Sequence, residues 1–357
     1  MPQPDVATVE VVSVAGLATV QDGGRPGWRR FGLPAGGALD PALLRIANTL
    51  AGQTQDAPAI EFFGAGPTLK ALDAPLLLGL AGDMGATLLR PDGEQRRLDG
   101  WRSVLLQPGE ALRIGAPRRA RAGVVAVRGL RVAPVLGSAS TFQRAALGGH
   151  AGRALAAGDR LQAAPLPAQP AAATLARVLR RPPKPVADAP IRVVLGPQAD
   201  HFDADALQSF LSAGFTVTPD ADRMGVRLAA APGAALKHNA RGSEVVSDAT
   251  VPGSMQVPGN GQPLVLLADG QTAGGYPKIA TVASADLARL ALAPVGTVLR
   301  FAAVSVEQAE DAARDHAAGL DRLLATIEPL TLDGDVDLAA LYAGNLVSGM
   351  INALAPA

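Results

Sequence analysis

Polar residues between positions 241 and 286 stand among glycines, prolines and apolar residues. Glycine lets a backbone approach a ligand closely and proline stiffens the loop that carries it, so the pattern is typical of a binding site. Lys278 follows the run GGYP in a chain with only four lysines, and a lysine among apolar residues suits the stabilisation of a developing oxyanion. The polar residues of this group are Glu244, Gln256, Asn260, Asp269, Gln271, Thr272, Tyr276 and Lys278.

The same group has a simpler interpretation. Polar residues between short strands also occur in ordinary turns, where their side chains hydrogen-bond the local backbone. For Lys278, the corresponding alternative is a solvated lysine at the end of a strand. Residue types and spacing leave both interpretations open, although so many functional side chains in one stretch favour a site.

A second group lies in residues 19–41, TVQDGGRPGWRRFGLPAGGALDP, where arginines follow closely spaced glycines. Arginine on such a loop suits the recognition of a carboxylate or a phosphate, so we expect Gln21, Asp22 and Arg25 to bind substrate. The spacing matches neither GxxxxGK followed by Ser or Thr nor the dinucleotide pattern GxGxxG. The sequence therefore predicts no ATP site in this chain.

Residues that commonly hold metals or act as nucleophiles are sparse. The chain has no cysteine, and its four histidines have no ligand-like spacing. No GxSxG nucleophile motif is present. We therefore expect no metal site and no cofactor bound by this chain itself.

Composition narrows the class of protein. The 357 residues carry a formal net charge of zero, which gives no general attraction to nucleic acid or to a membrane surface. No apolar stretch approaches the roughly 18 residues that span a bilayer, and the first residues lack a signal-peptide pattern. We expect a cytoplasmic protein that acts on a small molecule.

The elements that must position these residues are mostly short strands. Forty glycines and 29 prolines are scattered through the chain, as expected for strands joined by tight turns. Helices are expected after Asp40, after Asp203 and over 305–327, where Ser305 and Gln308 have capping-box spacing. Runs of alternating or β-branched residues predict strands at 9–14, 123–129, 191–195, 263–268 and 297–304.

Two β-rich units are expected. The Pro/Ala-rich stretch 166–190 is typical of a linker, and similar layouts flank it: LLLGLAGDMGAT then LQPGEALRIGA before it, LVLLADGQTAGG then LAPVGTVLRFA after it. We therefore predict one β-barrel unit over 1–165, a second over 191–304 and a helical C-terminal extension over 305–357. The apolar end of that extension suits packing on the barrels or contact with another subunit.

Several stretches also resemble a known family when taken in order. They are TVQDGGRPGWRRFGLPAGGALDP, EFFGAGPTL, GSASTFQRAALGGHAGRALAAGDRL, DRMGVRL, SEVVSD and VPGSMQVPGNGQPLVLLADGQTAGGYPKIATVASADL. The chain resembles the biotin-dependent carboxyltransferase family, which includes the C subunit of bacterial ATP-dependent 5-oxoprolinase (the KipA, or allophanate hydrolase subunit 2, group) and part of urea carboxylase. The resemblance covers roughly residues 8–303. It implies two cyclophilin-like β-barrel domains, in agreement with the strand-rich pattern.

The resemblance implies a subunit of a multi-chain enzyme. Its partners would be the KipI-type B subunit and the LamB/YcsF-type A subunit, and the favoured activity is ATP-dependent opening of 5-oxo-L-proline to L-glutamate. Arg25 or Lys278 would then hold the substrate carboxylate or an acyl-phosphate-like intermediate.

Two alternatives follow from the same resemblance. In a biotin-dependent carboxyltransferase acting on urea or a similar amide, Lys278 and Tyr276 would stabilise the biotin ureido oxyanion, and Asp269 or Glu244 would orient or deprotonate the acceptor. The chain has no biotin-attachment motif of the Met-Lys-Met kind, so the biotin would arrive on another chain. The other alternative is a KipA-like regulator that binds a KipI-type inhibitor of a sensor kinase.

Overall fold

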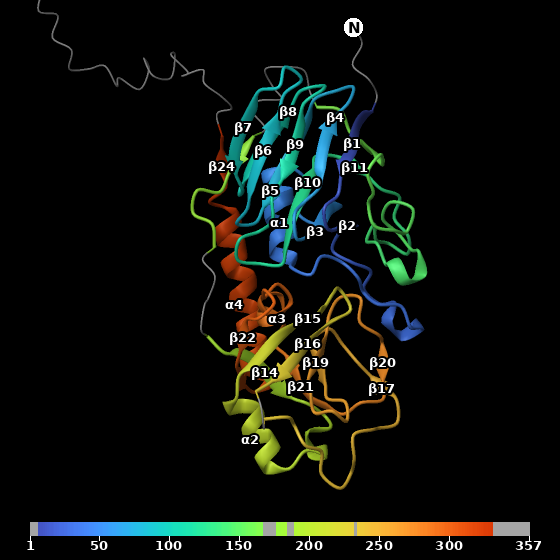
Figure 1. Cartoon of the computed structure of the whole chain (residues 1–357), viewed down its shortest axis with the longest axis vertical. Helices are drawn as coiled ribbons and strands as arrows, with labels where there is room; N and C mark the ends of the chain where they lie inside the picture. Colours follow the sequence, from blue (N-terminus) through green and yellow to red (C-terminus); the bar gives the residue numbers. More distant parts are fainter. Residues whose placement is uncertain (1–5, 167–175, 184–188, 232–233, 331–357) are drawn as a thin grey trace, which may run out of the picture.

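The computed structural model describes residues 6–166, 176–183, 189–231 and 234–330. Two β-rich units follow one another along the long axis of the molecule (Figure 1), and the described residues include four α-helices. The expectation of a mainly β chain with few helices is confirmed. The apolar C-terminal stretch, 331–357, lies outside the described residues.

The first unit contains two seven-stranded sheets. Along the first sheet the order is β11 (Leu130–Arg131), β12 (Arg160–Ala163), β1 (Ala7–Ser13), β4 (Thr68–Ala71), β9 (Ala111–Ile114), β6 (Gly85–Leu89) and β7 (Gln95–Asp99). Along the second it is β2 (Leu17–Gln21), β3 (Ala59–Phe63), β10 (Ala122–Val127), β5 (Leu76–Ala81), β8 (Arg102–Leu106), β13 (Arg177–Val178) and β24 (Glu328–Pro329).

The two sheets pack face to face around one apolar core. Val9 and Leu69 of the first sheet belong to the same buried cluster as Val20, Ile60 and Leu78 of the second. Burial alternates along β1, because successive side chains of a strand point to opposite faces. Every residue of β5 and β10 is buried, which means that the outer face of the second sheet is covered as well.

The second unit is built on an eight-stranded sheet that almost closes on itself. Its two end strands, β22 and β23, are separated in the sequence by Arg300 alone, so the chain itself joins the two edges of the sheet. A separate pair, β17 (Asp248–Ala249) and β20 (Ala273–Gly274), lies beside it (Figure 1). The order is β22 (Val298–Leu299), β15 (Phe215–Ala221), β16 (Gly225–Ala230), β19 (Leu264–Leu266), β18 (Ser254–Gln256), β21 (Lys278–Val282), β14 (Ile191–Leu195) and β23 (Phe301–Ala303).

The helices expected from capping signals are present. Asp40 caps α1 (Pro41–Leu50), accepting hydrogen bonds from Ala42 N at 2.8 Å and Leu43 N at 3.2 Å. Asp203 caps α2 (Ala204–Ser212), and Ser305 with Gln308 forms a capping box at α4 (Val306–Leu324). The remaining helix, α3 (Ser284–Ala291), is not among the expected helices. Within the described ranges, three short 3-10 helices span Arg29–Phe31, Gln143–Ala145 and Ala199–His201.

Helix α1 covers the outer face of the second sheet at β5 and β10. A Cβ placed on Gly79 of β5 would lie 2.1 Å from the Ala47 carbonyl oxygen and 2.7 Å from the Ala51 nitrogen. The helix backbone therefore reaches the strand only because position 79 has no side chain. This contact buries Leu44, Ala47 and the rest of the inner face of α1.

The chain crosses between the units more than once. After the second unit, α4 contacts α1, α3 and β14, and β24 then pairs with β13 in the second sheet of the first unit. The described part of the Pro/Ala-rich stretch contains β13, which also pairs with β8. Arg121 ties the units further, donating to the Ala221 carbonyl at 2.8 Å and to the Ala291 carbonyl at 2.5 Å.

No helix in the described part of the chain is both long enough and apolar enough to cross a membrane.

The close approach of α1 to β5 predicts a large cost for a single added methyl group. Gly79→Ala should lower the free energy of unfolding by about 1–3 kcal/mol, because the methyl group would overlap the α1 backbone. Gly319→Ala is the matched control, since a Cβ there would meet only Arg322 Nη2 at 3.8 Å. Inside α4 that change should stabilise by about 0.5–1 kcal/mol. Urea unfolding measures both, and equal effects would contradict the close packing of α1 on β5.

Candidate functional site

A buried ion-pair triad lies where the two units meet. Arg223, in the turn between β15 and β16, donates from Nε to Asp269 Oδ2 at 2.9 Å and from Nη2 to Asp269 Oδ1 at 3.0 Å. Its Nη1 donates to Oε1 of Glu61, on β3 of the first unit, at 2.5 Å. All three side chains are buried. One arginine of the second unit thus pairs with a carboxylate from each unit.

The triad also fixes the loop that precedes α1. Arg223 Nη2 donates to the Gly37 carbonyl at 2.7 Å, and Glu61 Oε2 accepts from Leu39 N at 2.7 Å. Burial alone would lower the pKa of Arg223, but the charges and hydrogen bonds of the two carboxylates outweigh burial and raise it. Both Asp269 oxygens accept hydrogen bonds from the guanidinium, so this carboxylate holds the loop in place and is not exposed as a base.

The glycine-rich segment after β2 is held by a second carboxylate. Asp22 accepts from Ser138 Oγ at 2.6 Å, Ala139 N at 2.6 Å, Ser140 Oγ at 2.5 Å and Gly24 N at 2.8 Å. These bonds lock the start of the segment to residues 138–140. Asp22 therefore positions the segment. The polar groups in or beside the segment that lack hydrogen-bond partners among the described residues belong to Gln21, Arg25 and Arg29.

Arg25 is fully buried in the middle of this frame. Its Nη2 donates to the Ser140 carbonyl, while Nε and Nη1 have no hydrogen-bond partner among the described residues. A Cβ on Gly36 would lie 3.0 Å from Arg25 Nη1 and 3.9 Å from Asp269 Oδ1, so the guanidinium lies beside the triad. Burial lowers the pKa of Arg25, and the charges of Asp22 and Asp269 oppose that shift.

Arg29 reaches from the first unit to the second. Its Nη2 donates to the carbonyls of Thr250 at 2.7 Å and Gln271 at 3.1 Å, and burial lowers its pKa. Gln271 Nε2 in turn donates to Gln256 Oε1 at 3.0 Å. A Cβ on Gly274 would lie 2.3 Å from Gln256 Nε2, so glycine at 274 makes room for this amide. The structure therefore brings Gln256 and Gln271, both predicted site residues, into contact.

Five buried side-chain atoms at this junction have no hydrogen-bond partner in the part of the chain that the structure describes. Leaving such groups unpaired is costly, so they are expected to meet a ligand or ordered water. Four of the five are N–H donors, which is the chemistry that binds a carboxylate, a phosphate or a carbonyl oxygen. They are Gln21 Oε1, Arg25 Nε, Arg25 Nη1, Arg29 Nη1 and Gln256 Nε2.

Lys278 lies on β21, beside Gln256 on β18. Its side chain is 4% exposed, and Nζ donates to Asp248 Oδ2 at 2.7 Å. That hydrogen bond lowers the pKa of Asp248, and Gln198 Nε2 donates to the same oxygen at 3.1 Å. The buried ammonium group is thus paired with a half-exposed carboxylate on β17, and it is not a solvated strand-end lysine.

The remaining predicted site residues lie further out. Tyr276 and Glu244 are exposed, and neither side chain makes a hydrogen bond to the described residues. Thr272 accepts at its carbonyl from Thr250 N at 3.0 Å, which continues the β17–β20 pairing. Asn260 lies in the loop after β18, where its Oδ1 accepts from Gln262 N at 3.0 Å. Its observed role is to shape a turn.

Sequence reasoning did not select Arg223, Glu61 or Asp248 as site residues. Each lies in a stretch that carries the family resemblance: DRMGVRL, EFFGAGPTL and SEVVSD. Their place in these stretches was the signal in the sequence that could have marked them as site residues. Nothing in residue type or spacing says which distant carboxylate an arginine will meet.

The triad predicts a strong effect on stability. Arg223→Gln leaves Glu61 and Asp269 buried without their cation, so the free energy of unfolding should fall by about 3–5 kcal/mol. Arg227→Gln removes the same charge from an exposed position on β16 and should change it by less than about 0.5 kcal/mol. Urea unfolding measures both variants. Equal stability of the two would refute the role assigned to Arg223.

The Lys278–Asp248 pair predicts a dependence on pH. The pKa of Asp248 is lower in the folded chain than its ordinary value of 3.8. The pair therefore stabilises the folded chain at pH values above 3.8, and this stabilisation is lost as the pH falls through the pKa of the folded state. Asp248→Asn should therefore be less stable than the parent at neutral pH and equally stable in strong acid. Asp220→Asn, at an exposed site, provides the control and should show no such convergence. Unfolding curves at several pH values give the comparison.

Comparison with known proteins identifies the family of this chain. The model of the carboxyltransferase domain, subdomain A and B, matches residues 31–303. The chain is 34% identical to the C subunit of 5-oxoprolinase from Escherichia coli over 322 residues, covering 88% of this chain and 97% of that one. With the C subunit of 5-oxoprolinase from Haemophilus influenzae the identity is 33%, over 88% of this chain and 97% of that one.

A solved structure gives the same answer. The structure of the Kluyveromyces lactis urea carboxylase superposes with a TM-score of 0.76 at 25% identity, covering 94% of this chain and 30% of that chain. The resemblance expected from the motifs is confirmed. The chain belongs to the family of the carboxyltransferase domain, subdomain A and B.

Proposed function

We propose that this chain is the C subunit of an ATP-dependent 5-oxoprolinase complex, which opens 5-oxo-L-proline to L-glutamate. The observation that carries the proposal is the similarity to the C subunits of two 5-oxoprolinases, which extends over 97% of the length of each. Almost every part of those subunits therefore has a counterpart in this chain.

The unpaired donors at the junction of the units fit this substrate. 5-Oxoproline carries a carboxylate and a lactam carbonyl, and opening the lactam builds negative charge on the carbonyl oxygen. Buried guanidinium and amide N–H groups aimed at such charge stabilise it strongly, because little water competes. Arg25, Arg29 and Gln256 offer such donors, and we assign to them the substrate carboxylate or an acyl-phosphate-like intermediate.

Lys278 has a further role in this proposal. Its ammonium group is already paired with Asp248, so it acts as a fixed positive charge beside Gln256 rather than as a base. Tyr276 and Glu244 are exposed near the β17–β20 pair, and we assign them to contact with the entering substrate.

The proposal requires other chains. The sequence offers no nucleotide-binding motif, so ATP would be used on a different polypeptide. We propose the KipI-type B subunit and the LamB/YcsF-type A subunit as the partners, in the cytoplasm, where ATP is supplied.

Carboxyl transfer is the second candidate, because the family model and the fold of the Kluyveromyces lactis urea carboxylase both match. The unpaired donors of Arg25 and Gln256 fit the oxygens of a carboxylated biotin as well as those of a substrate carboxylate. When bound, carboxybiotin would supply an activated carboxyl group from another chain. This chain would hold its oxygens and keep water away from them.

Reconstitution separates the two candidates. The chain is co-expressed with a KipI-type protein and a LamB/YcsF-type protein, and glutamate release from 5-oxo-L-proline is measured with ATP. Glutamate that appears only when all three chains are present supports the first proposal. If both partners bind and no glutamate forms, the 5-oxoprolinase proposal fails and carboxyl transfer from a biotin-bearing chain is tested next.

Arg25→Lys should reduce kcat/KM of the assembled complex by about 10- to 100-fold, because lysine keeps the charge and loses the forked donors. Arg30→Lys is the matched control on the same segment, at an exposed position, and should leave kcat/KM within about twofold of the parent. Co-purification of the three chains shows that assembly is intact. Full activity of Arg25→Lys would remove Arg25 from the site.

A further inference from the structure

Large apolar side chains are exposed around the point where Arg29 joins the two units. Phe31, in the 3-10 turn that begins at Arg29, is 66% exposed, and Val246, shortly before β17, is 93% exposed. Val251 is exposed as well. Of the phenylalanine, tyrosine and tryptophan residues that the structure describes, only Phe31 and Tyr276 are exposed, and both belong to this region. Apolar side chains gathered in this way on a surface mark an interaction site.

Hydrogen bonds join the two parts of this surface. Arg29 Nη2 donates to the Thr250 carbonyl at 2.7 Å and to the Gln271 carbonyl at 3.1 Å. Thr250 directly follows β17 and Gln271 lies two residues before β20, so the blue turn that carries Phe31 lies against the β17–β20 pair (Figure 1). Val246 lies two residues before β17, so the exposed side chains follow this pair from one end to the other.

The turn that carries Phe31 is held by its own contacts. Phe31 N donates to the Trp28 carbonyl at 2.9 Å, and the centres of the Trp28 and Phe31 rings are 5.7 Å apart. The Arg30 guanidinium lies 4.8 Å from the centre of the Phe31 ring. A Cβ on Gly27 or on Gly32 would meet nothing within 4 Å, so the turn projects from the surface. Aromatic rings and arginines held in place in this way contribute most to the affinity of protein interfaces.

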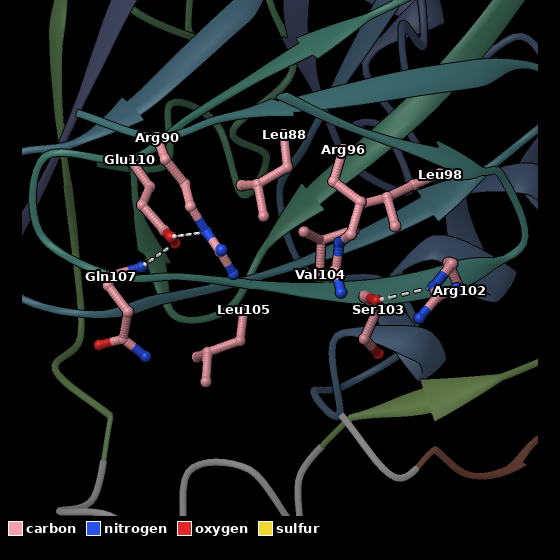
Figure 2. A pocket seen from close by; sticks show the side chains of 10 residues that line it. All are labelled: Leu88, Arg90, Arg96, Leu98, Arg102, Ser103, Val104, Leu105, Gln107 and Glu110. Carbon is pink, nitrogen blue, oxygen red and sulfur yellow. Dashed lines mark hydrogen bonds and ion pairs between the residues drawn. The ribbon is translucent and has the colours of Figure 1, made fainter. Parts of the chain in front are cut away.

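The charge of Arg30 is not paired with a carboxylate of the described residues, and the contact that the structure gives it is the Phe31 ring. The first unit offers a contrast. In the cavity of about 190 Å³ that β6, β7 and β8 line, Arg90 is paired with Glu110 at 3.3 Å (Figure 2). A protein that docks on the turn would gain an ion pair from a carboxylate placed beside Arg30. The charge therefore favours a partner with an acidic face.

We propose that this surface is where another protein subunit docks, through a face that carries an apolar pocket and carboxylates. The inference rests on the proposed function, which requires further chains. In the Kluyveromyces lactis urea carboxylase the matched region is 30% of the chain, so further protein is joined to this fold there. A subunit seated here would cover Gln271 and Tyr276 and keep water from the candidate site. The residues of the docking surface are Arg30, Phe31, Val246 and Val251.

Calorimetric titration of the full-length chain with a KipI-type protein, and separately with a LamB/YcsF-type protein, tests the docking surface. The parent should bind at least one of them. Phe31→Asp should weaken that binding by about 30-fold or more, and Val246→Asp by about tenfold. Val306→Asp is the matched control, because Val306 is equally apolar and exposed but begins α4, on the other side of the molecule from β17 and β20 (Figure 1).

The control should leave the dissociation constant within about twofold of the parent. If the parent binds neither protein, or if Phe31→Asp binds as tightly as Val306→Asp, the proposal is wrong. Thermal unfolding of the three variants should match the parent, since all three side chains are exposed. Val246→Asp keeps the test valid should Phe31→Asp fold poorly.

Reversing the charge of Arg30 tests the acidic face of the partner. Arg30→Glu should weaken binding by about tenfold or more at low salt, chiefly through slower association, and the difference from the parent should shrink as sodium chloride is added. Arg30→Lys keeps the charge and should bind nearly as the parent does. Equal binding of Arg30→Glu and the parent at low salt contradicts an acidic partner face.

Two further measurements separate this inference from its alternatives. If light scattering shows a dimer of the chain alone that Phe31→Asp dissociates, a second copy covers the surface and the proposal is wrong. Glutamate release by the three chains, with equal binding of all variants, keeps the 5-oxoprolinase function and removes the docking surface. Binding that Phe31→Asp abolishes, without glutamate release by the parent complex, supports the docking surface and removes that function.

Discussion

The pairing of Arg223 with Glu61 and Asp269 is the interaction on which the arrangement of the two units depends. Three buried ionised groups are tolerable only together, since a single charge removed from water costs several kcal/mol. The ion pairs therefore fix the position of β3 of one unit relative to the β15–β16 turn of the other. The position of the loop between Gly37 and Leu39 is fixed as well, because both residues hydrogen-bond to the triad.

The candidate site is a consequence of that constraint. The carboxylates of Asp22 and Asp269 accept hydrogen bonds that hold the loops in place. The neighbouring N–H donors of Arg25 are left without partners among the described residues. Such donors sit on a frame fixed before any ligand arrives, which is the condition under which electrostatic stabilisation is most effective. The work of the site is thus divided between residues that hold the loops and residues that face the ligand.

The local elements were largely predictable from the sequence. Asp40, Asp203 and Ser305 indicated three helices through capping, and β-branched runs indicated the strands. Helix α3 has no side-chain cap, so the signal used for the others was missing. The triad was beyond reach, because Arg223 and Glu61 are 162 positions apart and their pairing is set by tertiary packing. Asp269 and Lys278 were selected by residue type, but their ion-pair partners, Arg223 and Asp248, were not.

The return of the chain to the first unit has a consequence for synthesis. Strand β24 joins β13 in the second sheet although residues on those strands are far apart in sequence, and the whole second unit is made between them. On the ribosome, the first unit therefore waits with an unpaired sheet edge until almost all of the described chain has emerged. Exposed edges of this kind invite pairing with other chains. The yield of native protein should therefore depend on how quickly translation delivers α4 and the strand that follows it.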